Sequence, residues 1–264
     1  MPVRSIVTFV DPAEVGQSPA ALSLALDWAA GQGARVVVLS FPVDVTGDAL
    51  SEETQDFART SAAIRALADK AGVPVSVIDR SSFAYGIGDV FADHMKVADL
   101  GILTGRRGPL LGERLLVNAA LFDSGRPLVV VPRKGRLAPP RRALIAWDGT
   151  HTAARALQDA IAILPPGSEA IVARVTEDKD LRMGQSGIEA AHHLARHGIK
   201  AEFRDIPREG RDIFDALTTT AQETGCDLIA AGAVRHSPLH EIIFGSVTGK
   251  VLAGDCDLPV LLSA

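Results

Sequence analysis

Residues 35–41 read Arg35-Val36-Val37-Val38-Leu39-Ser40-Phe41, an uninterrupted apolar run that is rich in β-branched side chains. A strand without alternation of apolar and polar residues is typical of a parallel sheet that is covered on both faces. Apolar residues at helical spacing precede this run at 19–32, and a second helical pattern follows at 51–71. Strands that alternate with helices in this way predict βαβ units and an open α/β domain.

The alternation continues through the chain and restarts once. In the first half we expect strands at 5–10, 35–41, 73–78, 100–104 and 127–131, with helices at 19–32, 51–71, 88–97 and 112–122. In the second half we expect strands at 143–147, 170–175, 199–205, 228–231 and 259–262, with helices at 152–164, 181–197, 212–224 and 246–253. The sequence therefore predicts two tandem, open, doubly wound domains, 1–132 and 142–264, each with a five-stranded parallel sheet. The basic, proline-containing stretch 133–141 is the expected linker.

The two halves also match residue by residue. Ala98-Asp99-Leu100 corresponds to Cys226-Asp227-Leu228, and residues 123–130 correspond to residues 255–262. The offset between the copies is 128 at Asp99 and Asp227 but 132 at Asp123 and Asp255, so insertions and deletions separate them. This pattern indicates an internal duplication.

Composition narrows the range of functions. The 264 residues carry a net charge of −5 and 47% hydrophobic residues, and no basic stripe indicates binding to nucleic acid. We see neither a signal peptide nor an apolar run of about 20 residues, so we expect a soluble cytoplasmic protein without a membrane partner. Cys226 and Cys256 form no disulfide framework, which favours a reducing compartment.

Ligands of open parallel sheets bind beyond the carboxyl ends of the strands, where the strand order reverses. In the second half, Asp148-Gly149-Thr150 follows the first strand and Gly232 follows the fourth. The loop that Gly232 opens closes on Gly245-Ser246, at an expected helix start, where free N–H groups suit a phosphate. The same two residues could equally serve to cap the helix, and both interpretations stay open at this point.

These residues resemble the universal stress protein family in its tandem form, over both halves of the chain. That family has a Gly-x2-Gly-x9-Gly-Ser/Thr loop after its fourth strand and an Asp-Gly-Ser-like turn after its first. The resemblance implies an adenine nucleotide alpha hydrolase-like fold. It also implies that Asp148, in the turn with Gly149 and Thr150, faces the adenine-ribose end and that the backbone of Val175 meets the adenine. The residues that it implies for the phosphates are Gly232, Gly245, Ser246 and Val247.

The chain departs from the family pattern at Arg235, which replaces the second loop glycine. An arginine in a left-handed conformation is strained by about 1–2 kcal/mol, which would weaken a backbone cradle for phosphate. Its guanidinium can also bind phosphate directly. Arg235 therefore either weakens the phosphate site or replaces part of it, and we include it among the expected site residues.

The first copy departs further. Pro12 follows Asp11 and has no N–H to donate, and Glu113-Arg114 stands where the second copy has Gly245-Ser246. We therefore expect a degenerate site and a structural or regulatory role for residues 1–132. Because members of the family commonly dimerise through their last strands, we also expect the copies to pack as a pseudo-twofold pair through 127–131 and 259–262.

Other signals carry less weight. Gly245 to Lys250 mimics a Walker loop but has three residues between its glycines, and Val251 stands where Ser or Thr is needed. The histidines at 192, 193 and 197 fit a solvated helix face better than a metal site. His236, Ser237 and Asp148 lack the motif of a hydrolase triad. We therefore expect no catalytic or metal-ligating residue.

Three functions remain as hypotheses. The first is a stress-response regulator that binds ATP or another adenine nucleotide, with Mg²⁺ only as the nucleotide's companion. The second is a nucleotide-free scaffold that acts by association with a protein partner or as a homodimer. The third is a slow ATP hydrolase or phosphotransferase. Nucleotide extracted from the purified protein would discriminate the first from the second.

Overall fold

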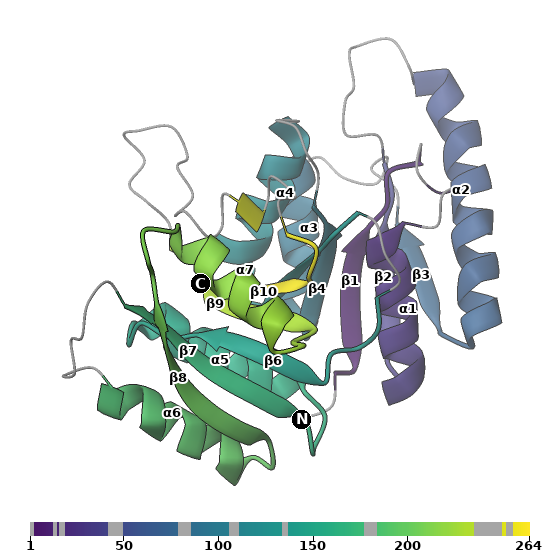
Figure 1. The fold of residues 1–264 in the computed structure, drawn as a ribbon. Coiled ribbons are helices and arrows are strands. Elements are labelled where there is room, and N and C mark those ends of the chain that lie inside the picture. The colour runs from purple at the N-terminus through teal and green to yellow at the C-terminus, as the bar shows by residue number, and fades with distance from the viewer. Residues whose placement is uncertain are drawn as a thin grey trace. The chain divides into compact units, whose positions relative to one another are not determined.

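The computed structural model describes residues 3–12, 15, 19–41, 50–78, 86–105, 111–133, 137–176, 184–234, 250–251 and 256–264, with backbone alone for 50–56, 111–114 and 184–185. It divides into two compact units, Val3–Pro139 and Pro140–Ala264 (Figure 1). Among the described residues, no helix combines the length and the apolar character needed to cross a bilayer. Each unit is an open α/β domain of its own.

The first unit has five parallel strands in the order β3-β2-β1-β4-β5. Its elements are β1 (Ser5–Phe9), α1 (Ala20–Gln32), β2 (Arg35–Leu39), α2 (Leu50–Ala71), β3 (Val75–Ile78), α3 (Ile87–Lys96), β4 (Leu100–Thr104), α4 (Leu111–Phe122) and β5 (Leu128–Val131). The apolar run with which the sequence analysis began is β2, the neighbour of β1, and its last four residues are buried. A doubly wound parallel sheet, as predicted, is confirmed.

The second unit repeats this topology in the order β8-β7-β6-β9-β10. Its elements are β6 (Arg142–Ala146), α5 (His151–Ile163), β7 (Glu169–Thr176), α6 (Gly184–Arg196), β8 (Lys200–Pro207), α7 (Ile213–Glu223), β9 (Leu228–Gly232) and β10 (Val260–Ser263). Of the predicted helix at 246–253, Lys250 and Val251 are helical, and its other residues lie outside the described residues. The outer strand β8 is longer than predicted, because it pairs with β7 as far as Pro207.

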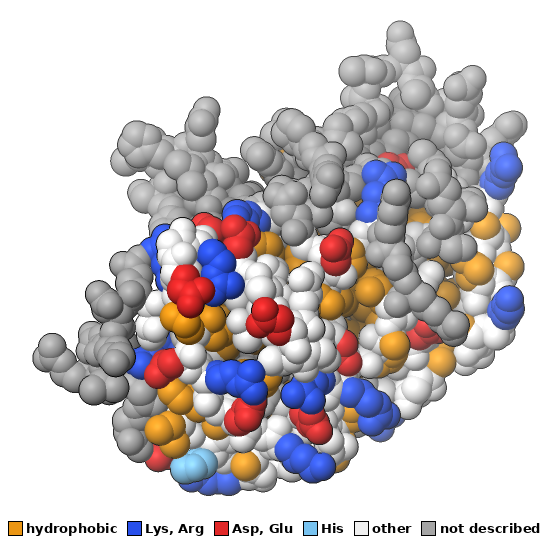
Figure 2. All heavy atoms as spheres, in the orientation of Figure 1, with side chains coloured by type: hydrophobic (Ala, Val, Ile, Leu, Met, Phe, Trp, Pro, Cys, Tyr) orange, Lys and Arg blue, Asp and Glu red, His pale blue; other side chains and the backbone are white. Residues whose placement is uncertain are grey.

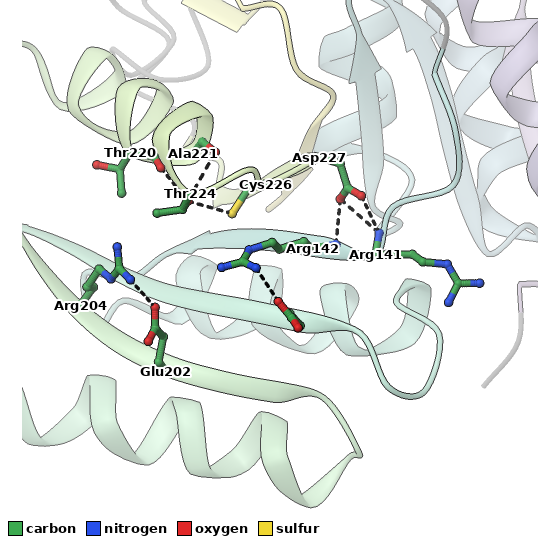
Figure 3. A network of polar contacts seen from close by, with 10 residues as sticks. Arg141, Arg142, Glu202, Arg204, Thr220, Ala221, Thr224, Cys226 and Asp227 are labelled. Atoms are coloured by element: carbon green, nitrogen blue, oxygen red, sulfur yellow. Dashed lines mark hydrogen bonds and ion pairs between the residues drawn. The ribbon is translucent and has the colours of Figure 1, made fainter.

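A repeated aspartate fixes the start of the central strands in both units. The Asp227 carboxylate accepts hydrogen bonds from the backbone N–H groups of Arg141 and Arg142 at 2.9 Å, while its own N–H donates to the Arg142 carbonyl at 2.8 Å (Figure 3). In the first unit, Asp99 accepts from the N–H groups of Arg4 and Ser5 and donates to the Ser5 carbonyl. The two matching sequence triplets therefore share one structural task, which is to join the start of strand one to the start of strand four.

The cores are apolar, and the outer strand β8 is not. Trp28, Phe91 and Phe214 are among the largest fully buried side chains. By contrast, β8 exposes Lys200, Glu202 and Arg204 on one face. These three side chains belong to a charged row that continues across β7 and β6, where Glu169 lies opposite Lys200 and forms an ion pair with Arg142. On the face drawn in Figure 2, acidic and basic side chains are interspersed.

Replacing Asp227 with alanine tests the repeated aspartate. Loss of two charge-assisted hydrogen bonds to backbone N–H groups should lower the free energy of unfolding of the second unit by about 1–2 kcal/mol. Urea denaturation followed by circular dichroism measures this change. The control is Asp93→Ala, which removes the exposed partner of Lys96 and should leave the midpoint nearly unchanged. Equal midpoints for the Asp227 variant and the control would show that the carboxylate does not hold the strands.

Candidate functional site

In the second unit the strand order reverses between β6 and β9, which lie side by side. Ile145 of β6 is in register with Ala230 of β9. Two residues further along the chain are Trp147, which follows β6 directly, and Gly232, the last residue of β9. The two strands therefore end within one residue of each other. The turn after β6 and the residue that ends β9 are thereby brought together at the carboxyl edge of the sheet, where ligands of this fold class bind.

The turn after β6 is built around the Asp148 carboxylate. Its Oδ1 atom accepts hydrogen bonds from the Thr150 N–H at 2.9 Å and from the Thr150 hydroxyl at 2.6 Å. Gly149 between them has φ +75°, a conformation that favours glycine. The Thr150 hydroxyl in turn accepts from the Ala153 N–H at 3.2 Å and so caps α5. The turn therefore presents an exposed carboxylate beside the start of a helix.

Gly232 lies directly against this helix start. A Cβ atom at position 232 would come within 2.6 Å of the Thr152 hydroxyl, 2.7 Å of the Thr152 carbonyl carbon and 2.8 Å of the Ala153 nitrogen. These distances are shorter than any real Cβ contact, and two of the three atoms belong to backbone. Only a residue without a side chain can end β9 here. The chain of β9 therefore leaves the sheet in contact with the first turn of α5.

Val175 contributes its peptide group at the same edge. The Ala173 carbonyl accepts from the Trp147 N–H on the β6 side, and the Thr176 carbonyl accepts from the Arg208 N–H on the β8 side. In a parallel strand the backbone N–H and C=O of one residue point to the same side, and alternate residues share a side, so the N–H and C=O of Val175 point toward the β6 side, like those of Ala173. The β6–β7 ladder ends at Ala146 and Ala173. The backbone N–H and C=O of Val175 thus face the space just beyond the end of β6.

The structure brings together the described members of the predicted site and leaves the others undescribed. Asp148, Gly149, Thr150, Val175 and Gly232 all lie at the carboxyl edge of the sheet, around the end of β6. The remaining predicted residues lie outside the described residues: Arg235, Gly245, Ser246 and Val247. The described half of the candidate site is the half that the resemblance assigns to the base and ribose, together with the first glycine of the loop.

Two further residues belong to this edge, and of these Thr152 was missed by sequence reasoning. The Thr152 hydroxyl is buried, lies 3.1 Å from the Thr150 hydroxyl and meets Gly232. Sequence reasoning gave no signal for Thr152, because threonine is common in the first turn of a helix. Its contact with Gly232 joins residues that lie far apart in the sequence. Trp147 donates its indole N–H to the Ser186 hydroxyl at 3.1 Å, which ties the end of β6 to α6.

Lys250 pairs with two carboxylates at the start of α7. Its ammonium donates to the Asp215 carboxylate at 2.8 Å and lies 3.4 Å from the Asp212 carboxylate. The hydrogen bond with Asp215 raises the pKa of Lys250 above its ordinary value. A Walker lysine must reach the phosphates of its ligand. The pairing with α7 therefore agrees with the expectation that this Walker-like sequence is a mimic.

The equivalent edge of the first unit is built differently. Thr104 ends β4 as Gly232 ends β9, and its hydroxyl accepts a hydrogen bond from the Ala21 N–H at 3.3 Å. The connection from β1 to α1 spans residues 10–19, whereas that from β6 to α5 spans 147–150. Glu113 lies in the first turn of α4, with its side chain outside the described part of the chain. The side chain that accepts from the helix start thus comes from the end of β4 in the first unit, whereas in the second unit it comes from Thr150 in the turn itself.

The two cysteines and the histidines of α6 are candidates for reactive or metal-binding groups. Cys226 and Cys256 are free and buried, and burial raises the pKa of both thiols, which disfavours the reactive thiolate. The rings of His193 and His197 meet edge to face at 4.8 Å on α6. Among the described residues, no group of three or more His, Cys, Asp or Glu side chains could hold a metal ion.

Comparison with known proteins finds a family match for the second unit. Residues 140–263 match the model of the universal stress protein family. A universal stress protein from Archaeoglobus fulgidus DSM 4304 is similar with a TM-score of 0.69 and 16% identity, over 97% of this chain and 95% of that chain. A functionally unknown protein from Pseudomonas aeruginosa PAO1 is similar with a TM-score of 0.54 and 18% identity, over 99% of this chain and 92% of that chain. No curated protein sequence matches the chain significantly. The second unit is thus similar to the universal stress protein family, and the fold of these structures extends over both halves.

The contact between Gly232 and α5 predicts a steep cost for one added methyl group. Gly232→Ala should lower the free energy of unfolding by about 1–3 kcal/mol, because the new Cβ atom forces β9 away from the first turn of α5. The matched control is Gly31→Ala, where the added atom meets nothing within 4 Å. That change lies in the last turn of α1 and should be neutral or stabilising by up to about 1 kcal/mol. Urea denaturation compares the two, and similar midpoints would contradict the close contact.

Proposed function

We propose that this protein is a stress-response regulator that binds one adenine nucleotide, ATP or a close relative, in its second unit. The observation that carries the proposal is the meeting of the Asp148 turn, Gly232 and the first turn of α5 at the switch point of the sheet. The contact of Gly232 with α5 places the residue that opens the candidate phosphate loop beside the Asp148 turn. The family match of residues 140–263 supports the same assignment.

Each described group of the candidate site can be assigned to one part of an adenine nucleotide. The backbone N–H and C=O of Val175 offer one donor and one acceptor beyond the end of β6, which suits the edge of an adenine ring. The exposed Asp148 carboxylate suits ribose hydroxyls. Gly232 leads into the loop whose Gly245, Ser246 and Val247 would hold the phosphates, with Arg235 either supplying its guanidinium or loosening the loop. Mg²⁺ would arrive with the nucleotide's phosphates.

The described residues favour binding over catalysis. The Asp148 carboxylate already accepts two hydrogen bonds within its own turn. Lys250 is held by Asp212 and Asp215. A phosphoryl-transfer site needs a group that orients the nucleophile and a cation that stabilises the transferred phosphate. The groups of the described edge fit a role in which nucleotide occupancy changes the protein's shape or its choice of a protein partner.

The two units should differ in nucleotide binding. Because Pro12 has no N–H to donate and Glu113 stands where the second unit has Gly245, we expect calorimetric titration with ATP to give a stoichiometry near one per chain. Mass spectrometry of nucleotide extracted from the purified protein should find an adenine nucleotide. Two equivalent sites would contradict the assignment of the first unit, and a protein without nucleotide or ATP binding would instead support a scaffold that acts by association.

Paired aspartate variants locate the site. For a dissociation constant of about 10 μM, ATP at about 1 mM should stabilise the bound unit by roughly 2.7 kcal/mol and raise its unfolding midpoint by several degrees. Asp148→Ala should abolish most of this rise, measured by thermal denaturation with and without ATP. The matched control is Asp11→Ala, its counterpart in the first unit, which should keep the full rise. Equal rises in both variants would remove Asp148 from the site.

A further inference from the structure

A polar cavity of about 380 Å³ lies on one face of β6, β7 and β8, toward the end where these strands begin. Its volume is near the lower limit for pockets that bind small molecules. The candidate nucleotide site lies at the opposite end of the same strands, so the cavity is separate from it. The side chains that give it its chemistry are those of Arg142, Glu169, Ile171, Lys200, Glu202 and Arg204.

Strand pairing places the charged side chains of the cavity on one face of the sheet. Arg142, Glu169 and Lys200 are in register on three neighbouring strands, and the other two charged residues follow at alternate positions along β8. The opposite face of β8 is covered by α6, because Gly187 lies so close to Phe203 that a Cβ atom there would overlap the ring. The charged face is therefore the accessible face of this outer strand.

The cavity has one positive charge in excess. The Arg142 guanidinium donates to the Glu169 carboxylate at 2.5 Å, and the Arg204 guanidinium donates to the Glu202 carboxylate at 2.6 Å (Figure 3). Within the described part of the chain, the Lys200 ammonium forms neither an ion pair nor a hydrogen bond. Two neutral pairs and one additional ammonium favour a ligand with a single negative charge.

Arg142 is fixed at its backbone but incompletely satisfied at its side chain. Asp227 accepts from its N–H and donates to its carbonyl. Its Nε atom is buried and has no hydrogen-bond partner among the described residues, although the guanidinium also interacts with the Cys226 thiol, a weak acceptor. A buried N–H without an acceptor is costly. Because the side chain is 39% exposed, a turn of the guanidinium toward the cavity would bring this N–H to a ligand oxygen.

The described strands of the first unit do not repeat this set of charges. Ser5 and Arg35 are paired at the start of β1 and β2, where the second unit pairs Arg142 with Glu169. The outer strand β3 is apolar except for Ser76. The same sheet topology thus forms without these side chains, so the fold itself does not require them.

We propose that this cavity binds a small molecule through one oxyanion, either a carboxylate or a phosphate. Lys200 and Arg142 bind the oxyanion, because both offer N–H donors that carry positive charge. The buried Ile171 contacts the uncharged part of the ligand. Glu169 and Glu202 repel any further negative charge, which limits the ligand to one such group. The inference does not depend on the proposed nucleotide function.

The test is an NMR titration of ¹⁵N-labelled protein with acetate and with inorganic phosphate, at an ionic strength held constant with sodium chloride. The amide signals of Ile171 and Ala201 should shift saturably. Tighter binding of acetate would identify a carboxylate ligand, and tighter binding of phosphate a phosphorylated one. Lys200→Gln should weaken the binding about tenfold, because a charge-assisted hydrogen bond is lost. The matched control is Lys70→Gln, an exposed lysine of the first unit, which should leave the affinity unchanged.

A variant of opposite sign gives a second test. Glu169→Gln removes a carboxylate that competes for Arg142 and should strengthen the binding of the anion severalfold. The affinity for ATP should stay the same in the Glu169 and Lys200 variants. Absence of saturable shifts at Ile171 and Ala201 with both anions would overturn the inference, as would an equal loss in Lys200→Gln and Lys70→Gln. Either result would leave the proposed nucleotide function standing.

Discussion

The carboxylate of Asp227 holds the start of β6 against the start of β9, and most of the second unit's architecture depends on this contact. In a parallel pair, the register at one end determines which residues face each other at the other end. Asp227 sets that register by binding the N–H groups of Arg141 and Arg142 while its own N–H pairs with the Arg142 carbonyl. The two strands then end at one level, and Gly232 arrives against the first turn of α5.

Both units have this aspartate contact at the start of the central strands, and they differ in the contacts at the carboxyl ends of those strands. Asp99 performs the same task in the first unit. At the other end of the strands, however, the Thr104 hydroxyl accepts a hydrogen bond from α1. Gly232, at the corresponding position of the second unit, has no side chain and packs directly against α5. The contacts that fix the topology have thus been retained after duplication, while the contacts at the ligand edge have diverged.

The fold was predictable from sequence because its signals are local. Continuous apolar strands, helical spacing and repeated triplets placed every described strand and helix of both units to within a few residues. The relations between distant residues were not predictable in this way. The triplets around Asp99 and Asp227 were visible as a repeat, yet their hydrogen bonds to strand one required the folded chain. The same holds for the contact of Thr152 with Gly232 and for the pairing of Lys250 with Asp215, which lies 35 residues earlier. Such contacts are set by packing, which periodicity does not encode.

The charged row across β6, β7 and β8 has a consequence for the behaviour of the chain in the crowded cell. An outer strand of eight residues is long enough to recruit a strand from another molecule and to begin aggregation. Lys200, Glu202 and Arg204 place charges along this strand, and a second molecule that added to it would have to desolvate them. The pairs Arg142–Glu169 and Arg204–Glu202 keep the two signs balanced. The charged side chains of β8 therefore disfavour the addition of a further strand along this edge.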